Sequence, residues 1–170
     1  FKRLGLHQVW WLVTPGNPLK VGVPLPDVDE RMDVAHTLTA TVPQIKITGF
    51  EVALGSPFTI DTVTFLKRRY PLVRFVWIMG GDNLAQFHRW WRWRAVFESI
   101  PILVMDRPDA RLRALSSPAA GTYAHARIAQ ANAKTLTKLA PPIWSYISIP
   151  LSFQSSTAIR AKGLMPLSSV

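Results

Sequence analysis

The sequence predicts an α/β fold, in which a doubly wound parallel sheet is covered by helices on both faces. Two observations carry this prediction. Strand-like segments alternate with segments of helical periodicity along the 170 residues, and the strand-like segments are almost continuously apolar. Strands of this kind are typical of a parallel sheet buried between two layers of helices. The length suits one domain with a single core.

The N-terminal part of the chain begins with a helix end, followed by a strand. Residues 1–6 have the pattern of a helix C-terminus, because Gly5 suits the positive φ that often ends a helix. Residues 8–13 are rich in β-branched and aromatic side chains, which predicts a strand. Proline and glycine then predict a loop up to residue 27, and residues 29–41 carry apolar side chains at helical spacing.

The middle of the chain repeats this alternation. Residues 44–50 alternate like a strand, and residues 59–70 have the pattern of a helix that Thr59 is expected to cap. Residues 74–79 and 100–105 are the clearest strands, and a helix is expected between them over residues 88–99. The remaining elements are expected to be a weakly helical stretch, a strand and a short helix, over residues 116–139, 143–149 and 155–161.

The composition narrows the function classes. The net charge of +10 is compatible with an anionic partner, either nucleotide phosphates or nucleic acid, or with solubility alone. The chain has no cysteine, which excludes disulfides, thiolate nucleophiles and cysteine–zinc sites and fits a cytoplasmic protein. No apolar run approaches the ~20 residues of a membrane-spanning helix, so we expect no membrane partner.

Polar residues and glycines follow several of the predicted strands. They occur at residues 14–20, at residues 80–83, at Arg107 and at residues 155–157. Ligands of open parallel sheets bind beyond the carboxyl ends of the strands. We therefore expect these loops to form one site.

Several segments resemble bacterial nicotinate-mononucleotide adenylyltransferases. The Gly-Gly-Asp-Asn run at residues 80–83 and the Ser-Ser-Thr-x-Ile-Arg run at residues 155–160 are specific in combination. The matching segments are Trp10–Lys20, Glu30–Met32, Thr59–Thr62, Phe75–Trp90 and Ser155–Arg160. The resemblance implies a Rossmann-like fold and the transfer of adenylate from ATP to nicotinate mononucleotide. The products would be nicotinate adenine dinucleotide and pyrophosphate, in NAD biosynthesis.

The sequence departs from the family pattern at its start. The family opens with a strand and a Gly-x-Phe-x-Pro-x-His-x-Gly-His loop that cradles ATP phosphates, and no part of the chain matches it. We therefore expect residues 1–170 to be a single nucleotidyltransferase domain that lacks its first strand and phosphate loop. We also expect upstream residues to supply them. The activity of these residues alone stays open.

The resemblance assigns one group of residues to the pyridine side of the substrate. It implies that Trp90 stacks on the pyridine ring and that Trp91 shapes the same pocket. Thr59 would lie at the nicotinate carboxylate, and Asp82 would contact the substrate or ATP. Each residue also has a structural alternative, as a core aromatic, a helix cap or a turn residue. A helix N-terminus that receives the carboxylate would favour the acid over the amide, which is a hypothesis.

A second group is assigned to phosphates. Asn17 and Lys20 would contact the phosphate or ribose of the substrate. Arg107 would reach a phosphate, or alternatively would form a surface ion pair with Asp106. The helix start expected to bind ATP phosphates, or simply to be N-capped, contains Ser155, Ser156, Thr157 and Arg160.

No catalytic residue, general acid–base pair or metal-ligand cluster is identifiable in the sequence. This agrees with adenylyl transfer, which proceeds by positioning and charge neutralisation. The expected cofactor is Mg²⁺, which would bridge phosphates and keep most of its waters. The expected partners are therefore ATP and nicotinate mononucleotide.

Two alternatives stay open. The first is a sister adenylyltransferase that uses nicotinamide mononucleotide or pantetheine phosphate, although the latter needs no pyridine-stacking Trp90. The second is a non-catalytic protein that binds nucleotides or nucleic acid. Nucleic acid is disfavoured, because the basic residues around Trp90 belong to one expected helix without a recognised nucleic-acid motif. The oligomeric state is open, and a homo-oligomer is compatible with the sequence.

Overall fold

The computed structural model describes residues 4–16 and 26–149. The chain divides into two compact units. The larger unit contains residues 4–7 and 58–149 of the described part, and the smaller contains residues 8–16 and 26–57. No helix in the described part of the chain is both long enough and apolar enough to cross a membrane.

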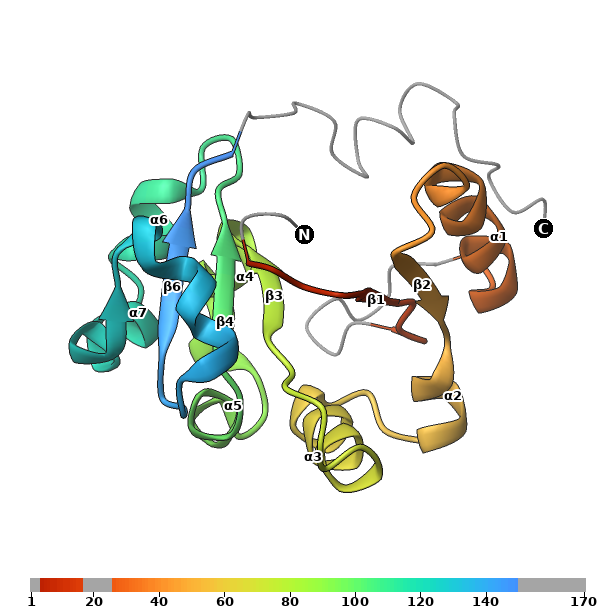
Figure 1. Cartoon of the computed structure of the whole chain (residues 1–170), viewed down its shortest axis with the longest axis horizontal. Coiled ribbons are helices and arrows are strands. Elements are labelled where there is room, and N and C mark those ends of the chain that lie inside the picture. Colours follow the sequence, from red (N-terminus) through yellow and green to blue (C-terminus); the bar gives the residue numbers. More distant parts are fainter. Residues whose placement is uncertain (1–3, 17–25, 150–170) are drawn as a thin grey trace. The chain divides into compact units, whose positions relative to one another are not determined.

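The larger unit is built on a parallel sheet with strand order β3-β4-β6-β5. Figure 1 shows β3, β4 and β6 side by side. Its strands are β3 (Trp77–Gly80), β4 (Ile102–Met105), β5 (Arg127–Ile128) and β6 (Trp144–Ile147). β4 lies between two partners and its side chains are buried at Ile102, Leu103 and Val104. The predicted parallel sheet with apolar strands is therefore confirmed.

Helices or helical turns cover both faces of this sheet. One face packs against α3 (Thr59–Arg69), α4 (Gly81–Gln86), α5 (Trp93–Ser99), α6 (Arg111–Leu115) and α7 (Pro118–Thr122). The other face packs Leu103 and Ile147 against Leu4 and the 3₁₀ helix η3 (Gln130–Lys138). Successive side chains of β4 and β6 thus enter different core clusters, as strand geometry requires. This confirms the prediction of a sheet covered on both faces.

The smaller unit is a parallel pair of strands with two helices. β1 (Val9–Leu12) pairs with β2 (Ile45–Thr48), and the helices are α1 (Val28–Thr39) and α2 (Phe50–Leu54). Arg31 ties the unit together, because its Nη1 donates to the Thr14 carbonyl at 2.8 Å and its Nε donates to the Pro26 carbonyl at 2.9 Å. Gly55 ends α2 at a φ of 67°, which favours glycine.

The helix predicted over residues 88–99 is confirmed only for residues 93–99, and its first part is wrong. A 3₁₀ turn, η1 (Phe87–Arg89), ends before Trp90, and α5 begins only at Trp93. Arg92 between them has a φ of 51°, in the left-handed region that non-glycine residues rarely adopt. Trp90 and Trp93 pack on different neighbours, Phe87 and Tyr123 respectively. Tertiary packing therefore overrides the helical spacing of this segment.

Two smaller predictions are also corrected. The helical stretch expected over residues 116–139 is divided into α7, a 3₁₀ turn η2 (Ala124–Ala126), β5 and η3. Thr59 is the first residue of α3 and not its cap, because the N-cap is Phe58, which has no capping side chain. The helix expected over residues 155–161 lies outside the described residues.

Candidate functional site

The polar residues that follow β3 and β4 meet at the carboxyl edge of the larger sheet. β3 ends at Gly80, and Asp82 lies in the first turn of α4. Arg107 follows β4, which pairs directly with β3. Arg107 Nε lies 3.9 Å from Asp82 Oδ1, and each side chain is about half exposed, at 51% and 57%. Because the pair is loose and open to solvent, either side chain can exchange its partner for a ligand.

Gly80 allows these two side chains to approach each other. A Cβ atom at Gly80 would overlap Asp82 Oδ1 and would lie 3.1 Å from Arg107 Nε. The next residue, Gly81, faces inward, and a Cβ there would lie 3.0 Å from the Tyr146 hydroxyl. The two glycines thus let the turn after β3 pass between a surface ion pair and a buried tyrosine.

Asp106 is buried, so the alternative of a surface ion pair between Asp106 and Arg107 is wrong in its partner: Arg107 pairs with Asp82 at the surface. Asp106 is 7% exposed. Its Oδ1 accepts hydrogen bonds from the Tyr146 hydroxyl at 2.6 Å and from the Arg107 backbone N–H at 2.9 Å. Arg111 Nη1 lies 3.9 Å from Asp106 Oδ2. The Arg107 side chain is therefore free to meet Asp82, whereas its backbone is held by Asp106.

The hydroxyl of Tyr146 acts as a hydrogen-bond donor in this cluster. Burial, together with the hydrogen bond to Asp106 and the charge of that residue, raises the pKa of the Tyr146 hydroxyl above its usual value. The phenol consequently keeps its proton, which it donates to the carboxylate.

Trp90 and Trp91 lie in the break between η1 and α5. Trp90 is half-buried and packs on Phe87, with ring centroids 4.8 Å apart. Trp91 is 62% exposed, and its ring centroid lies 5.9 Å from that of Phe58. The alternative that these tryptophans are core aromatics therefore applies in part to Trp90. Trp91 instead offers an exposed aromatic surface to a ligand.

Thr59 is brought close to Trp91 by the fold. It is the half-buried first residue of α3, an 11-residue helix, and follows Phe58 directly. Because Phe58 contacts Trp91, the start of α3 and the exposed indole are neighbours. An aromatic surface thus lies beside a helix N-terminus, where the partial positive charge of the helix dipole favours an anion.

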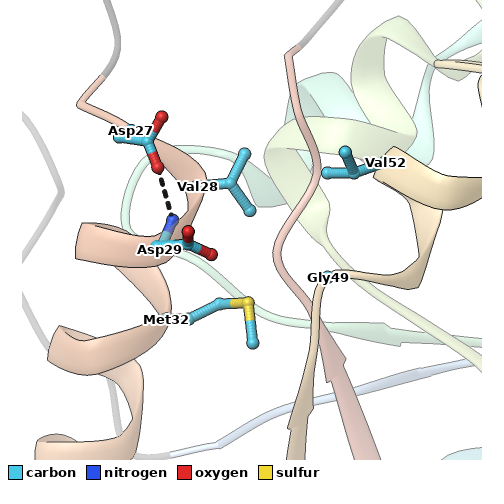
Figure 2. A pocket seen from close by; sticks show the side chains of 6 residues that line it. All are labelled: Asp27, Val28, Asp29, Met32, Gly49 and Val52. Atoms are coloured by element: carbon cyan, nitrogen blue, oxygen red, sulfur yellow. Dashed lines mark hydrogen bonds between the residues drawn. The ribbon is translucent and has the colours of Figure 1, made fainter.

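A separate pocket lies in the smaller unit (Figure 2). It has a volume of about 420 Å³ and is lined by Asp27, Val28, Asp29, Met32, Gly49 and Val52. Asp27 Oδ1 caps α1 by accepting a hydrogen bond from the Asp29 backbone at 2.8 Å (Figure 2). The lining includes no predicted site residue, and its two carboxylates repel phosphate. We therefore place the candidate nucleotide site at the strand ends of the larger unit.

Comparisons with known proteins identify the family. A family model described as cytidylyltransferase-like matches residues 1–162. A probable nicotinate-nucleotide adenylyltransferase of Cereibacter sphaeroides is 52% identical over 162 residues, which are 95% of this chain and 85% of the relative. The chain belongs to the nicotinate-nucleotide adenylyltransferase family. Relatives of the same description from Ruegeria pomeroyi and Agrobacterium fabrum are 47% and 46% identical, and the matches cover 75% and 84% of their lengths.

Solved structures related to this family share the fold. Two structures of Plasmodium falciparum nicotinic acid mononucleotide adenylyltransferase, complexed with APC and with NaAD, each align with a TM-score of 0.64. The alignments cover 94% of this chain and 72% of the other chain, at 15% and 16% identity. The match confirms the predicted Rossmann-like arrangement of the α/β fold.

The other family residues predicted from the sequence lie outside the described part of the chain. They are Asn17, Lys20, Ser155, Ser156, Thr157 and Arg160. Within residues 4–16 and 26–149, no group of three or more His, Cys, Asp or Glu side chains is placed to hold a metal ion. Mg²⁺ stays a prediction for this family member.

Sequence reasoning missed Tyr146 and the buried position of Asp106. Asp106 directly follows an apolar strand, which is a weak signal for a residue at the sheet edge. Tyr146 lies 40 residues further along the chain, within another apolar strand. No local pattern links these two residues, because the strand order of the folded sheet places them together.

Proposed function

We propose that this chain transfers the adenylate of ATP to nicotinate mononucleotide, as a single cytoplasmic nucleotidyltransferase domain. The observation that carries the proposal is the 52% identity to a probable nicotinate-nucleotide adenylyltransferase across 95% of the chain. The placement of Asp82, Arg107 and the exposed face of Trp91 in one unit agrees with such a site.

The proposed reaction forms one phosphorus–oxygen bond and breaks another. A phosphate oxygen of nicotinate mononucleotide attacks the α-phosphorus of ATP, and the bond to the β-phosphate bridging oxygen breaks. Pyrophosphate leaves with the electron pair of that bond, and the product is nicotinate adenine dinucleotide. Mg²⁺ bound to the phosphates would neutralise their charge, and Arg107 would supply a further cation. The protein contributes position and charge to this step, without a nucleophile of its own.

The pyridine ring is proposed to bind near the two tryptophans. The exposed indole of Trp91 and the half-buried indole of Trp90 offer flat surfaces for an aromatic ring. Thr59 is the first residue of α3, and we propose that the nicotinate carboxylate binds there. The helix dipole favours a carboxylate by about 0.3–2 kcal/mol, which corresponds to roughly 2- to 30-fold in specificity. The neutral amide, which has no net charge, would gain less from this site.

The decisive test compares the acid and amide mononucleotides as substrates. The chain is incubated with ATP, Mg²⁺ and either mononucleotide, and the dinucleotide product is separated by chromatography and quantified. We expect kcat/KM for the acid to exceed that for the amide by roughly 2- to 30-fold. A preference for the amide would contradict the substrate assignment.

A binding assay separates this function from the non-catalytic alternative. Labelled single-stranded oligonucleotides are titrated with the chain at two salt concentrations. Submicromolar binding at physiological salt, together with no dinucleotide product, would replace the enzyme proposal by a nucleic-acid-binding one. Dinucleotide formation with weak, strongly salt-dependent oligonucleotide binding would support the enzyme.

A further inference from the structure

The carboxylate of Asp106 connects the turn after β4 to the neighbouring strand β6. Asp106 follows the last residue of β4, and Tyr146 lies within β6, in register with Val104 of β4. The Tyr146 hydroxyl reaches Asp106 Oδ1 at 2.6 Å, and the same oxygen accepts the Arg107 backbone N–H at 2.9 Å. One buried oxygen thus joins a strand side chain to the backbone of a candidate phosphate-binding residue.

The Tyr146 hydroxyl also lies under the turn after β3. A Cβ atom added at Gly81 would lie 3.0 Å from this hydroxyl, so the phenol occupies the space next to Gly81. Gly81 is buried and immediately precedes Asp82. The phenol therefore lies next to the residue that precedes Asp82, and it is linked to Arg107 through Asp106.

We propose that Tyr146 and Asp106 form a positioning pair that holds Arg107 and Asp82 in the orientation that receives the phosphate of a nucleotide. This inference rests on the proposed function for the identity of the ligand. Neither residue of the pair needs to touch the nucleotide. Tyr146 stays protonated and donates, and Asp106 accepts from both sides, so the backbone of Arg107 is fixed while its guanidinium stays exposed.

The matched variants are Tyr146→Phe and Tyr123→Phe. Each removes one hydroxyl that donates to a carboxylate, at 2.6 Å for Tyr146 and at 2.8 Å for Tyr123, whose partner Glu98 is on α5. Both rings are buried, and phenylalanine preserves their packing. The two variants therefore lose similar interactions, but only Tyr146 is connected to Arg107 through a shared acceptor.

The first measurement is hydrogen exchange of the Arg107 backbone amide in the complete chain. We expect Tyr146→Phe to accelerate this exchange by about 10-fold, because the Asp106 carboxylate loses the hydrogen bond from the Tyr146 hydroxyl. We expect Tyr123→Phe to leave the exchange unchanged. Equal exchange in wild type and Tyr146→Phe, or equal acceleration in both variants, would overturn the inference. This readout needs no ligand, so it decides on the positioning pair even if nicotinate mononucleotide fails to bind.

The second measurement is the Kd of nicotinate mononucleotide, by calorimetric titration. We expect Tyr146→Phe to raise the Kd about 5- to 10-fold and Tyr123→Phe to change it less than about 2-fold. No binding by the wild-type chain would refute the proposed function instead. Binding that is equally tight in wild type and Tyr146→Phe would overturn the positioning role while leaving the function intact.

Two variants of Asp106 keep the inference testable if Tyr146→Phe folds poorly. Asp106→Asn retains a side-chain oxygen that can accept both hydrogen bonds, whereas Asp106→Ala removes the acceptor. We expect the Arg107 amide of Asp106→Asn to exchange within about 3-fold of wild type and that of Asp106→Ala to exchange at least about 10-fold faster. Equal exchange in both variants would contradict the inference.

Discussion

A single methyl group at Gly80 is expected to disturb the candidate site while leaving the fold intact. Gly80 has extended backbone angles, with φ −79° and ψ 159°, that alanine adopts readily. In Gly80→Ala, the new Cβ would overlap Asp82 Oδ1 and would lie 3.1 Å from Arg107 Nε. Both side chains are half-exposed, so they can move aside into solvent. The substitution therefore displaces two candidate ligand contacts without removing either.

The size of the effect follows from this overlap. The Asp82 carboxylate must move by about 1 Å to reach an ordinary van der Waals separation. A misplacement of this size costs up to about 100-fold in rate, or about 2.7 kcal/mol of transition-state stabilisation. The free energy of unfolding is expected to change by less than about 1 kcal/mol, because replacing glycine by alanine at a compatible φ also restricts the unfolded chain.

The assay compares kcat/KM for dinucleotide formation with thermal unfolding of the same protein. Gly121→Ala is the matched control, because a Cβ atom at this residue of α7 would meet no neighbouring side chain within 4 Å. We expect kcat/KM to fall by about 10- to 100-fold in Gly80→Ala, the effect of misplacing a substrate contact. In Gly121→Ala we expect kcat/KM to stay unchanged. Unchanged kinetics in Gly80→Ala, or a fall in Tm of more than about 5 °C, would refute this reasoning.

Three further predictions concern stability and substrate binding. Burial, with the hydrogen bond and charge of Glu98, raises the pKa of Tyr123 from 10.0 to about 12. The protonated phenol therefore stabilises the fold below pH 10, and this stabilisation, at most about 3 kcal/mol, is lost as the pH rises towards 12. Urea unfolding across this range should show the loss in wild type relative to Tyr123→Phe, and parallel curves would contradict it. Separately, Trp90→Ala should raise the KM for nicotinate mononucleotide more than that for ATP, and Arg160→Ala should do the reverse. Trp91→Ala should destabilise the fold by less than about 1 kcal/mol, because its indole is 62% exposed. Steady-state kinetics and urea unfolding measure these effects, and equal KM changes for both substrates would oppose the assignment.

The sequence predicts the sheet well, because a strand that is buried on both faces consists of consecutive apolar residues. Ile102, Leu103 and Val104 are consecutive apolar residues, and the structure buries all of them between two core clusters. The meeting of Asp82 and Arg107 also follows from the sequence, since each is the second residue after one of two parallel strands, which pair with each other. These features depend on composition and strand direction, which can be inferred from the sequence.

The features that the sequence does not predict depend on contacts between distant residues. The hydrogen bond from Tyr146 to Asp106 spans 40 residues and requires β6 to lie next to β4. The sequence favours a surface position for Asp106, because a carboxylate next to an arginine usually is exposed. The buried carboxylate is compensated by the Arg107 backbone N–H, by Arg111 and by the Tyr146 hydroxyl, and the last of these comes from another strand.

The helix expected over residues 88–99 is interrupted at residues 90–92, and this interruption lies where the pyridine ring is proposed to bind. In one continuous helix, Trp90 and Trp91 would point about 100° apart, and neither orientation would depend on α3. Since the helix stops, Trp90 packs on Phe87 while Trp91 lies beside Phe58, next to the start of α3. Arg92 adopts a left-handed backbone conformation within this break. Sequences depart from their local preference most often at functional sites, where tertiary contacts maintain such strain. The break therefore gives a reason, independent of the family match, to seek the nicotinate ring between Trp91 and the start of α3.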